Sequence, residues 1–343
     1  MSRVKRMARI AVAGCGHWGK NLIRNFHSLG HLYAICDSNA AALALFAQQY
    51  PGVKACQDFT QLLLDPEVDA VALATPAEQH YPMTMAALRA GKDVFVEKPL
   101  ALDAEDGREI VQAARSQQAV LMVGHLLRYH PAVRKMQELI ADGALGRVDY
   151  IYSNRLSMGK IRKEENALWS FAPHDISVIL ALIGQSPVQV TATGGAYLQP
   201  NIADVTISNL LFDRGTRAHI FVSWLHPYKE QRLVVVGSKR MAVFEDTRPD
   251  NKLILFDKRI ELRNGNMEAE KPNGTPVAFD PGEPLRAECE HFIHCVRERL
   301  APLTAGEEGL KVLEVLEACQ RSLQMNGEPV QVNARRLQRV AVL

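Results

Sequence analysis

The sequence predicts an α/β protein with two domains. The first has a doubly wound parallel sheet, and the second is an α+β domain with one large open sheet, mixed or antiparallel. Two observations predict this order. Strand and helix patterns alternate from residue 8 to about residue 124, and short strand patterns with turn signals follow from 147 to 262. Parallel neighbours need crossover connections, which the helices of the first half supply. We therefore expect domains at 1–125 and 126–343.

The first half is divided by its apolar periodicity. We expect strands at 8–13, 32–37, 69–74, 93–97 and 119–123, and helices at 18–29, 40–49, 80–90 and 103–116. A further helix, 131–142, begins at Pro131, a residue suited to a first helical turn, and ends at Gly143.

In the second half, the alternation of apolar and polar residues indicates short strands. The expected strands are 147–155, 188–197, 204–213, 216–225, 231–237, 241–246 and 252–262, followed by helices 283–299 and 306–325. The polar tract 263–284 is rich in Asn, Gly, Pro and Glu, and we expect it to be a surface loop.

Composition excludes several classes of protein. The 343 residues are 47% hydrophobic and 23% charged with a net charge of +2, which is typical of a globular protein and gives no electrostatic footprint for nucleic acid or membrane. The six cysteines lack metal-ligand spacing, so we expect free thiols in the cytoplasm and no metal site. Of the classes of partner considered, a small molecule fits this composition best.

A glycine loop follows the first strand. Residues 8–19 end in Gly14-Cys15-Gly16-His17-Trp18-Gly19, a GxGxxG pattern between a strand and a helix, as in Rossmann domains. The three glycines allow a tight turn, close approach of the backbone to a pyrophosphate, and close packing of the helix on the sheet.

Asp37 ends the second strand about 20 residues after the loop, where an acidic side chain accepts hydrogen bonds from ribose hydroxyls. Ser38 and Asn39 follow, with no arginine for a 2′-phosphate, so we expect NAD as the cofactor.

Lys98 follows the apolar strand 93–97 and precedes Pro99. Ligands gather at the carboxyl ends of strands in open α/β sheets, and an ammonium there can stabilise the alkoxide-like charge of hydride transfer. The alternative is a strand-end lysine paired with Glu97.

The glycine loop, Asp37, Thr75-Pro76 with His80, and Glu97-Lys98-Pro99 together resemble the Gfo/Idh/MocA family of oxidoreductases, over nearly the whole chain. The resemblance extends to residues 124–131 and to the closing segments Pro302-Leu303-Thr304 and 306–310. It implies oxidation of a sugar or cyclitol hydroxyl with a pyridine nucleotide, with Lys98 on the reacting oxygen. The cofactor contacts that we expect are Gly14, Gly16, His17, Trp18, Gly19, Asp37, Thr75, Pro76, His80 and Glu97.

His174 is the best candidate for the acid or base that the resemblance places on the second domain. Pro173 predicts a helix start, which places His174 in the first turn, where the helix dipole disfavours imidazolium. The family pattern has acidic residues four before and three after this histidine. Ser170 and Ser177 stand there instead, and the adjacent Asp175 suits the helix terminus better than it suits orienting His174.

The segment before His174 carries three cations, Lys160, Arg162 and Lys163, and leads into Trp169. These could hold a diphosphate and stack on a base or sugar, although a solvated charged loop is the commoner outcome. The segment resembles the branch of the family associated with nucleotide sugars and surface polysaccharides. The substrate contacts that we expect are His125, Tyr129, Asn154, Arg155, Lys160, Arg162, Trp169 and Asp175.

The hypothesis is therefore oxidation at C3 of a UDP- or dTDP-linked sugar. A free cyclitol or monosaccharide dehydrogenase is an alternative, and a non-enzymatic NAD-dependent sensor is another. We expect a homodimer or homotetramer, because the strands of 188–262 should leave one sheet face for a second subunit.

Overall fold

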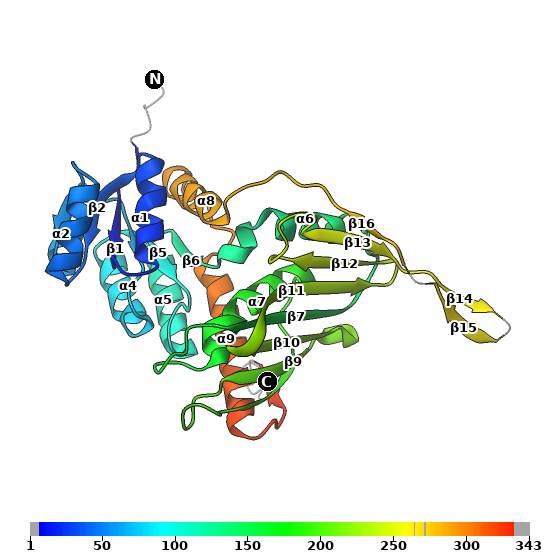
Figure 1. Cartoon of the computed structure of the whole chain (residues 1–343). Coiled ribbons are helices and arrows are strands. Elements are labelled where there is room, and N and C mark those ends of the chain that lie inside the picture. The colour runs from blue at the N-terminus through cyan, green and yellow to red at the C-terminus, as the bar shows by residue number, and fades with distance from the viewer. Residues whose placement is uncertain (1–6, 264, 271, 333–343) are drawn as a thin grey trace, which may run out of the picture. The chain divides into compact units, whose positions relative to one another are not determined.

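The computed structural model describes residues 7–263, 265–270 and 272–332, and its chain is divided into two compact units (Figure 1). One unit comprises Met1–Tyr129 and Gly282–Leu313, and the other His130–Pro281 and Glu314–Leu343. This division differs from the expected domains at 1–125 and 126–343. The first unit extends to Tyr129 and recruits a segment from near the end of the chain.

The first unit is built on a six-stranded parallel sheet with the order β3-β2-β1-β4-β5-β6. The strands are β1 (Ile10–Ala13), β2 (Leu32–Cys36), β3 (Lys54–Cys56), β4 (Ala70–Leu73), β5 (Asp93–Glu97) and β6 (Leu121–Gly124). Every residue of β1, β4 and β6 is buried, as expected for strands covered on both faces. The predicted Rossmann sheet is confirmed.

Helices follow the strands as crossovers. They are α1 (Gly19–Ser28), α2 (Ala40–Gln49), α3 (Phe59–Leu64), α4 (His80–Arg89) and α5 (Ala104–Ser116), with short 3₁₀ turns η1 (Ala77–Gln79) and η2 (Leu126–Tyr129). The side chains of Asn39, Asp58 and Asp103 accept backbone N–H groups at the starts of α2, α3 and α5. β3 and α3 were not predicted, because three and six residues are too few to show a period.

Helix α8 (Pro284–Glu298) belongs to this unit because Phe292 is buried with Phe26 of α1 and Phe95 of β5. The rings of Phe95 and Phe292 lie 5.7 Å apart, edge to face. This aromatic contact explains why 282–313 joins the first unit. Helix α9 (Gly306–Gln324) is divided between the units after Leu313.

The second unit is built on a nine-stranded sheet with the order β16-β13-β12-β11-β7-β10-β9-β8-β17. Its strands are β7 (Val148–Met158), β8 (Gln189–Gly195), β9 (Val205–Leu211), β10 (Arg217–Ser223), β11 (Leu225–Gly237), β12 (Arg240–Glu245), β13 (Leu253–Asp257), β16 (Gly274–Pro276) and β17 (Val330–Gln331). β10 and β7 are parallel and the other neighbours antiparallel, so the predicted mixed sheet is confirmed. Helix α7 (Ala167–Ile183) contacts β7, β9 and β10, and α6 (Pro131–Ala141) contacts α7 and β12.

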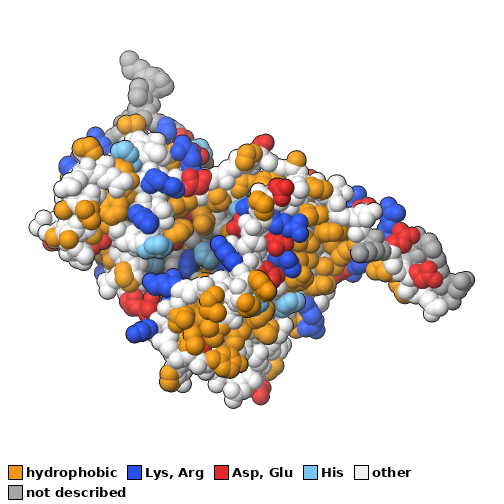
Figure 2. Space-filling model, viewed as in Figure 1, with side chains coloured by type: hydrophobic (Ala, Val, Ile, Leu, Met, Phe, Trp, Pro, Cys, Tyr) orange, Lys and Arg blue, Asp and Glu red, His pale blue; other side chains and the backbone are white. Residues whose placement is uncertain are grey.

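The tract 252–284 is more ordered than expected. In place of one strand at 252–262 and a loop at 263–284, the chain forms β13, a separate hairpin of β14 (Ile260–Arg263) and β15 (Asn266–Ala269), and the edge strand β16. After the hairpin, β16 pairs with β13. Glycine at position 274 allows this close pairing, because a Cβ there would lie 2.6 Å from the Phe256 ring. The hairpin extends away from the nine-stranded sheet (Figure 1), and Figure 2 shows acidic side chains on it.

Within the described residues, we find no helix that combines the length and hydrophobicity of a membrane span.

Candidate active site

The glycine loop has the geometry of a cofactor cradle. Gly14 has φ +95°, and a Cβ there would lie 2.6 Å from the Ala74 carbonyl oxygen, so only glycine fits between the ends of β1 and β4. A Cβ on Gly19 would overlap the Gly14 carbonyl at 1.7 Å. A Cβ on Gly16 would meet nothing within 4 Å, which leaves the open space that a pyrophosphate needs above the start of α1.

Asp37 lies beside this loop. Its Oδ2 accepts the backbone N–H of Cys15 at 2.7 Å, and its Oδ1 accepts that of Asn39 at 2.8 Å. The carboxylate therefore braces the loop from the end of β2. The side chain remains partly exposed, as a contact with ribose hydroxyls requires.

Three predicted residues stand at equivalent positions at the carboxyl edge of the sheet. Leu73 pairs with Val96, and Val96 with Val123, so Thr75, Lys98 and His125 each lie two residues beyond the paired position. The peptide bond between Lys98 and Pro99 is cis. This edge is where open α/β sheets bind ligands.

Buried polar atoms flank Lys98 at this edge. Neither ring nitrogen of His125 nor Oγ1 of Thr75 has a hydrogen-bond partner among the residues that the structure describes, and His125 is only 2% exposed. Burial, then the positive charges of Arg128 and Lys98, lower the pKa of His125 to about 3. His125 is therefore a neutral imidazole close to Lys98, with polar atoms available to a ligand.

His80 connects the turns after β4 and β5. Its Nδ1 lies 2.6 Å from the Pro99 carbonyl oxygen and its Nε2 lies 3.0 Å from that of Thr75. Burial lowers the pKa of His80, while its contacts with the two carbonyl groups act in the opposite direction. Both ring nitrogens already have protein partners, which indicates that His80 positions these two turns.

Glu97 and Trp18 join the glycine loop to β5. Trp18 is the residue before α1, and its indole N–H donates to the Glu97 carboxylate. Of the remaining predicted cofactor contacts, His17 and Pro76 are exposed.

Tyr129 lies in the core of the first unit. It is 3% exposed, and its hydroxyl lies 2.9 Å from Nδ1 of His291 and 3.3 Å from Oγ1 of Thr304. These contacts support a structural role for a residue that we expected to touch substrate.

In the second unit, the helix that carries His174 starts earlier than expected. α7 begins at Ala167 with Asn166 as its N-cap, and Pro173 lies inside it. His174 is therefore the eighth residue of the helix, and the prediction that it occupies the first turn was wrong. Because His174 is not at the helix terminus, the helix dipole no longer explains why its imidazole would be neutral. Pro173 misled the prediction because proline favours first turns but is tolerated elsewhere.

Asp175 and Arg155, both expected to touch substrate, form a buried ion pair. Arg155 Nε and Nη2 lie 2.8 Å and 3.1 Å from the two carboxylate oxygens, and the Ser153 hydroxyl donates to Oδ1 at 2.6 Å. The pair fastens β7 to α7. Asp175 does not lie at a helix terminus.

Of the other expected substrate contacts in the second unit, Asn154, Arg162 and Trp169 already bind protein side chains. Asn154 donates to Glu230 at 2.9 Å, and Arg162 pairs with Glu165 at 3.1 Å. The Trp169 indole N–H donates to Gln320 at 3.1 Å, while Lys160 is exposed. Gln320 also accepts from Asn166.

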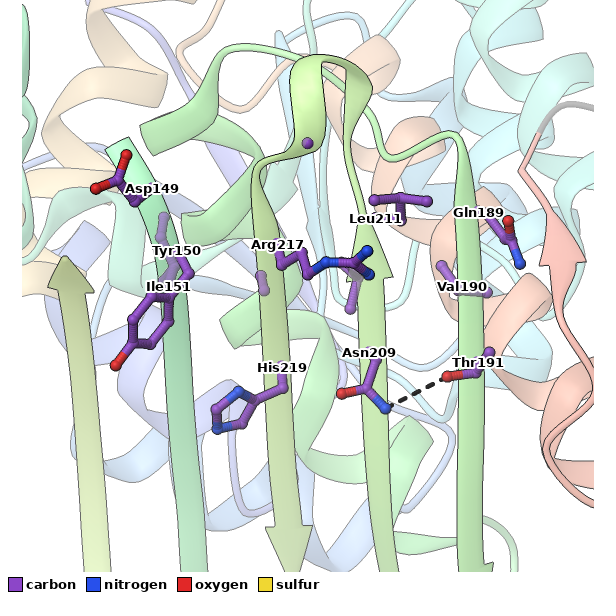
Figure 3. A pocket seen from close by; sticks show the side chains of 13 residues that line it. Asp149, Tyr150, Ile151, Gln189, Val190, Thr191, Asn209, Leu211, Arg217 and His219 are labelled. Atoms are coloured by element: carbon purple, nitrogen blue, oxygen red, sulfur yellow. Dashed lines mark hydrogen bonds between the residues drawn. The ribbon is translucent and has the colours of Figure 1, made fainter. Parts of the chain in front are cut away.

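A pocket of about 640 Å³ lies elsewhere, on the nine-stranded sheet (Figure 3). Its lining includes Tyr150, Thr191, Asn209, Arg217 and His219, from β7, β8, β9 and β10. None of the predicted site residues line it, so we do not assign the reaction to this pocket. In the part of the chain that is described, no group of three His, Cys, Asp or Glu side chains is arranged for a metal ion.

Sequence reasoning missed one candidate, Glu288. It lies within the expected helix 283–299, and it is completely buried. The signal was its position three residues after Leu285 and four before Phe292, on the apolar side of the helix.

Two family models match the chain. "Oxidoreductase family, NAD-binding Rossmann fold" matches residues 8–125, and "GFO/IDH/MocA C-terminal domain" matches residues 133–243.

Similar proteins extend over most of the chain. A UDP-N-acetylglucosamine 3-dehydrogenase from Acidithiobacillus ferrooxidans is 27% identical over 89% of this chain and 94% of its own. Its crystal structure has a TM-score of 0.82 over 93% and 98% of the two chains, at 25% identity. An inositol 2-dehydrogenase from Rhizobium meliloti is 27% identical over 92% and 96%.

A putative oxidoreductase from Magnetospirillum magnetotacticum is 30% identical, with a TM-score of 0.79 over 92% of this chain and 100% of its own. The glycine cradle and the strand-end lysine thus occur in a chain that matches both family models, and the protein belongs to the Gfo/Idh/MocA family of NAD-binding oxidoreductases.

Proposed function

We propose that the protein oxidises a sugar hydroxyl to a ketone, most specifically at C3 of a UDP- or dTDP-linked sugar, in the biosynthesis of a surface polysaccharide or an amino sugar. The observation that carries the proposal is the edge formed by Thr75, Lys98 and His125. This edge combines the Lys98 cation with the buried polar atoms of Thr75 and His125, which have no hydrogen-bond partner among the described residues. The glycine loop of the same sheet has the space that NAD needs.

The chemistry follows from these groups. NAD, when bound, accepts the hydride that leaves the sugar carbon. The Lys98 ammonium stabilises the negative charge that develops on the sugar oxygen, and the neutral His125 ring leaves that cationic role to Lys98. We assign to His174 the removal of the hydroxyl proton, on the family resemblance and the chemistry of imidazole.

The nucleotide-linked substrate is supported by similarity to the UDP-N-acetylglucosamine 3-dehydrogenase. Lys160 and Lys163 are exposed and can meet a diphosphate. The ion pairs of Arg162 with Glu164 and Glu165 reduce its value as a phosphate contact, so we expect the two lysines to contribute more.

The main alternative is a free cyclitol or monosaccharide, which the 27% identity to an inositol 2-dehydrogenase favours. Such a substrate needs no cations in 160–163. A non-enzymatic NAD-dependent sensor is a further alternative, and it requires no turnover at all.

A thermal-shift screen of the NAD-bound protein separates these functions. Nucleotide sugars, hexoses and inositols are tested in turn, because a ligand of the native state raises the melting temperature by mass action. We expect nucleotide sugars to give the largest shift. The triple variant Lys160→Ala, Arg162→Ala, Lys163→Ala should then raise KM for the hit, and an unchanged KM would exclude diphosphate recognition by this segment.

We also propose that the protein is a homodimer or homotetramer. Tyr150 and Ile207, both over 40% exposed, lie on the nine-stranded sheet away from Ile151 and Leu210, which are buried toward its helices. An exposed sheet face of this kind is a surface for a second copy of the chain.

A further inference from the structure

The first unit contains a carboxyl group with no exposed surface. Glu288 of α8 is 0% exposed, and neither of its oxygens has a hydrogen-bond partner among the described residues. An ionised carboxylate in such a place is strongly disfavoured, and a buried carboxyl without a partner usually keeps its proton.

Glu288 faces Glu97. Phe95 and Glu97 are two residues apart in β5, so their side chains lie on the same face of the sheet. Glu288 lies one helical turn before Phe292, on the same side of α8. The Phe95 and Phe292 rings are in contact, with centroids 5.7 Å apart, and this contact brings the two carboxyl groups to the same buried region.

Glu97 connects the parts of the nucleotide site. It accepts the indole N–H of Trp18 from the glycine loop, and it immediately precedes Lys98. Gly124, its partner in β6, leaves room for the carboxylate, because a Cβ there would lie 2.8 Å from Glu97 Oε2. A single carboxylate therefore ties the glycine loop to β5, the strand that Lys98 follows.

Two neighbouring anions are not both stable in this interior. Burial raises the pKa of Glu97 to about 7, although the Trp18 hydrogen bond and the Lys98 charge lower it. Burial, and then the Glu97 charge, raise the pKa of Glu288 well above its ordinary value. Among the described residues, the charge of Glu288 also acts on Tyr129 and Cys289, whose pKa values burial raises. The buried cation Arg128 lies beside Tyr129 on η2, which packs against α8.

We propose that Glu288 is a positioning residue that holds a proton at neutral pH, so that the Glu97–Glu288 pair carries at most one negative charge. That charge stays on Glu97, where Trp18 donates to it and Lys98 lies beside it. When Glu288 releases its proton to solvent at alkaline pH, the second anion repels Glu97. The link between the glycine loop and β5 weakens, and NAD affinity falls with it.

Infrared spectroscopy of the full-length protein tests the proton directly. The difference between wild type and Glu288→Gln should contain the carbonyl stretch of a protonated carboxyl at pH 7, and this band should disappear at alkaline pH. Glu290→Gln is the matched control, since Glu290 is an exposed carboxylate on the same helix, paired with Arg286. Absence of the band at pH 7 would overturn the proposal.

NAD titration tests the consequence. Glutamine is neutral and similar in shape, so Glu288→Gln should keep the dissociation constant for NAD within about twofold at pH 7, well under the tenfold that corresponds to 1.4 kcal/mol. It should also abolish the alkaline loss of affinity that we expect of the wild type. A tenfold weakening at pH 7 would mean that the charge of Glu288 is needed, which contradicts a stored proton.

Glu97→Gln provides a second variant in case Glu288→Gln does not fold. Without the Glu97 charge, Glu288 ionises more readily, and its infrared band should disappear at a lower pH than in wild type. An unmoved band would exclude coupling between the two carboxyls. These measurements use NAD and no sugar, so their failure would leave the proposed substrate class untouched.

Discussion

His125 shows how a single buried side chain at the sheet edge can be tested through stability. Burial with Arg128 and Lys98 nearby lowers its pKa from 6.5 to about 3, so between these values the unfolded chain binds a proton that the folded protein does not. Stability therefore rises with pH across this window and is lost as pH falls below 6.5.

We predict that His125→Gln removes part of this slope, measured as melting temperature against pH from 6.5 downward. His27→Gln, which replaces an exposed histidine of α1, is the control. Equal slopes in wild type and His125→Gln would show that His125 accepts a proton in the folded state as readily as in the unfolded chain.

Asp175 and Arg155 provide a second prediction for single residues. Asp175→Asn leaves Arg155, whose side chain is 12% exposed, without its bidentate partner, and should destabilise the protein by about 3–5 kcal/mol in denaturant unfolding. Arg147→Met breaks a pair with Asp149 at the start of β7, in which the Arg147 side chain is 81% exposed, and should cost less than about 1 kcal/mol. Comparable losses from the two variants would argue against a structural role for the buried pair.

Residue types at strand ends were easier to predict than their contacts. Lys98 could be placed at the carboxyl edge of the sheet from the strand before it, whereas Thr75 and His125 were expected from the family resemblance. The strand register then shows that all three lie at one edge. The pairing of Asp175 with Arg155 could not, since it depends on where α7 starts relative to β7. Pro173 suggested a start six residues too late, and the stronger signal was the N-cap Asn166.

At the level of elements, two glycines of the glycine loop have different roles. Gly14 is required by the backbone conformation, and Gly16 borders the open space that a ligand can occupy. We predict that Gly14→Ala lowers the melting temperature, because its φ of +95° and the Ala74 carbonyl 2.6 Å from the new Cβ both oppose a side chain. Gly16→Ala should leave the melting temperature near that of wild type and weaken NAD binding by about tenfold or more, since its Cβ enters open space.

Calorimetry and NAD titration of the two variants check this contrast. If Gly16→Ala bound NAD as wild type does, the open space above Gly16 would not be the pyrophosphate site.

Long periodic elements were predicted well, and short or polar ones were not. The parallel sheet followed from buried apolar runs separated by helical periods. β15 and β16 lie in a tract with polar composition, and their pairing with β14 and β13 comes from tertiary contacts such as Gly274 against Phe256. For α8, the sequence indicated a helix but not the unit it joins, because Phe26 and Phe95 are distant in sequence.

At the level of the whole molecule, the exposed face of the nine-stranded sheet leads to a prediction about assembly. We expect light scattering after gel filtration to give a dimer or tetramer. Replacing Tyr150 and Ile207 with glutamate should shift the protein toward monomer, because two charges would be buried in the contact.

Leu45→Glu is the control, since Leu45 is 68% exposed on α2 of the other unit. A wild-type monomer, or a double variant that assembles unchanged, would exclude this face as the contact.

The central claim is that Lys98 serves hydride transfer from a nucleotide-linked sugar to NAD. It is tested most directly by the absorbance of reduced nicotinamide after mixing protein and NAD with UDP- and dTDP-linked sugars. We predict NADH formation that falls by about a hundredfold or more in Lys98→Met, while NAD binding is retained. Turnover that is equal in Lys98→Met and wild type, or that occurs with free cyclitols and with no nucleotide sugar, would contradict it.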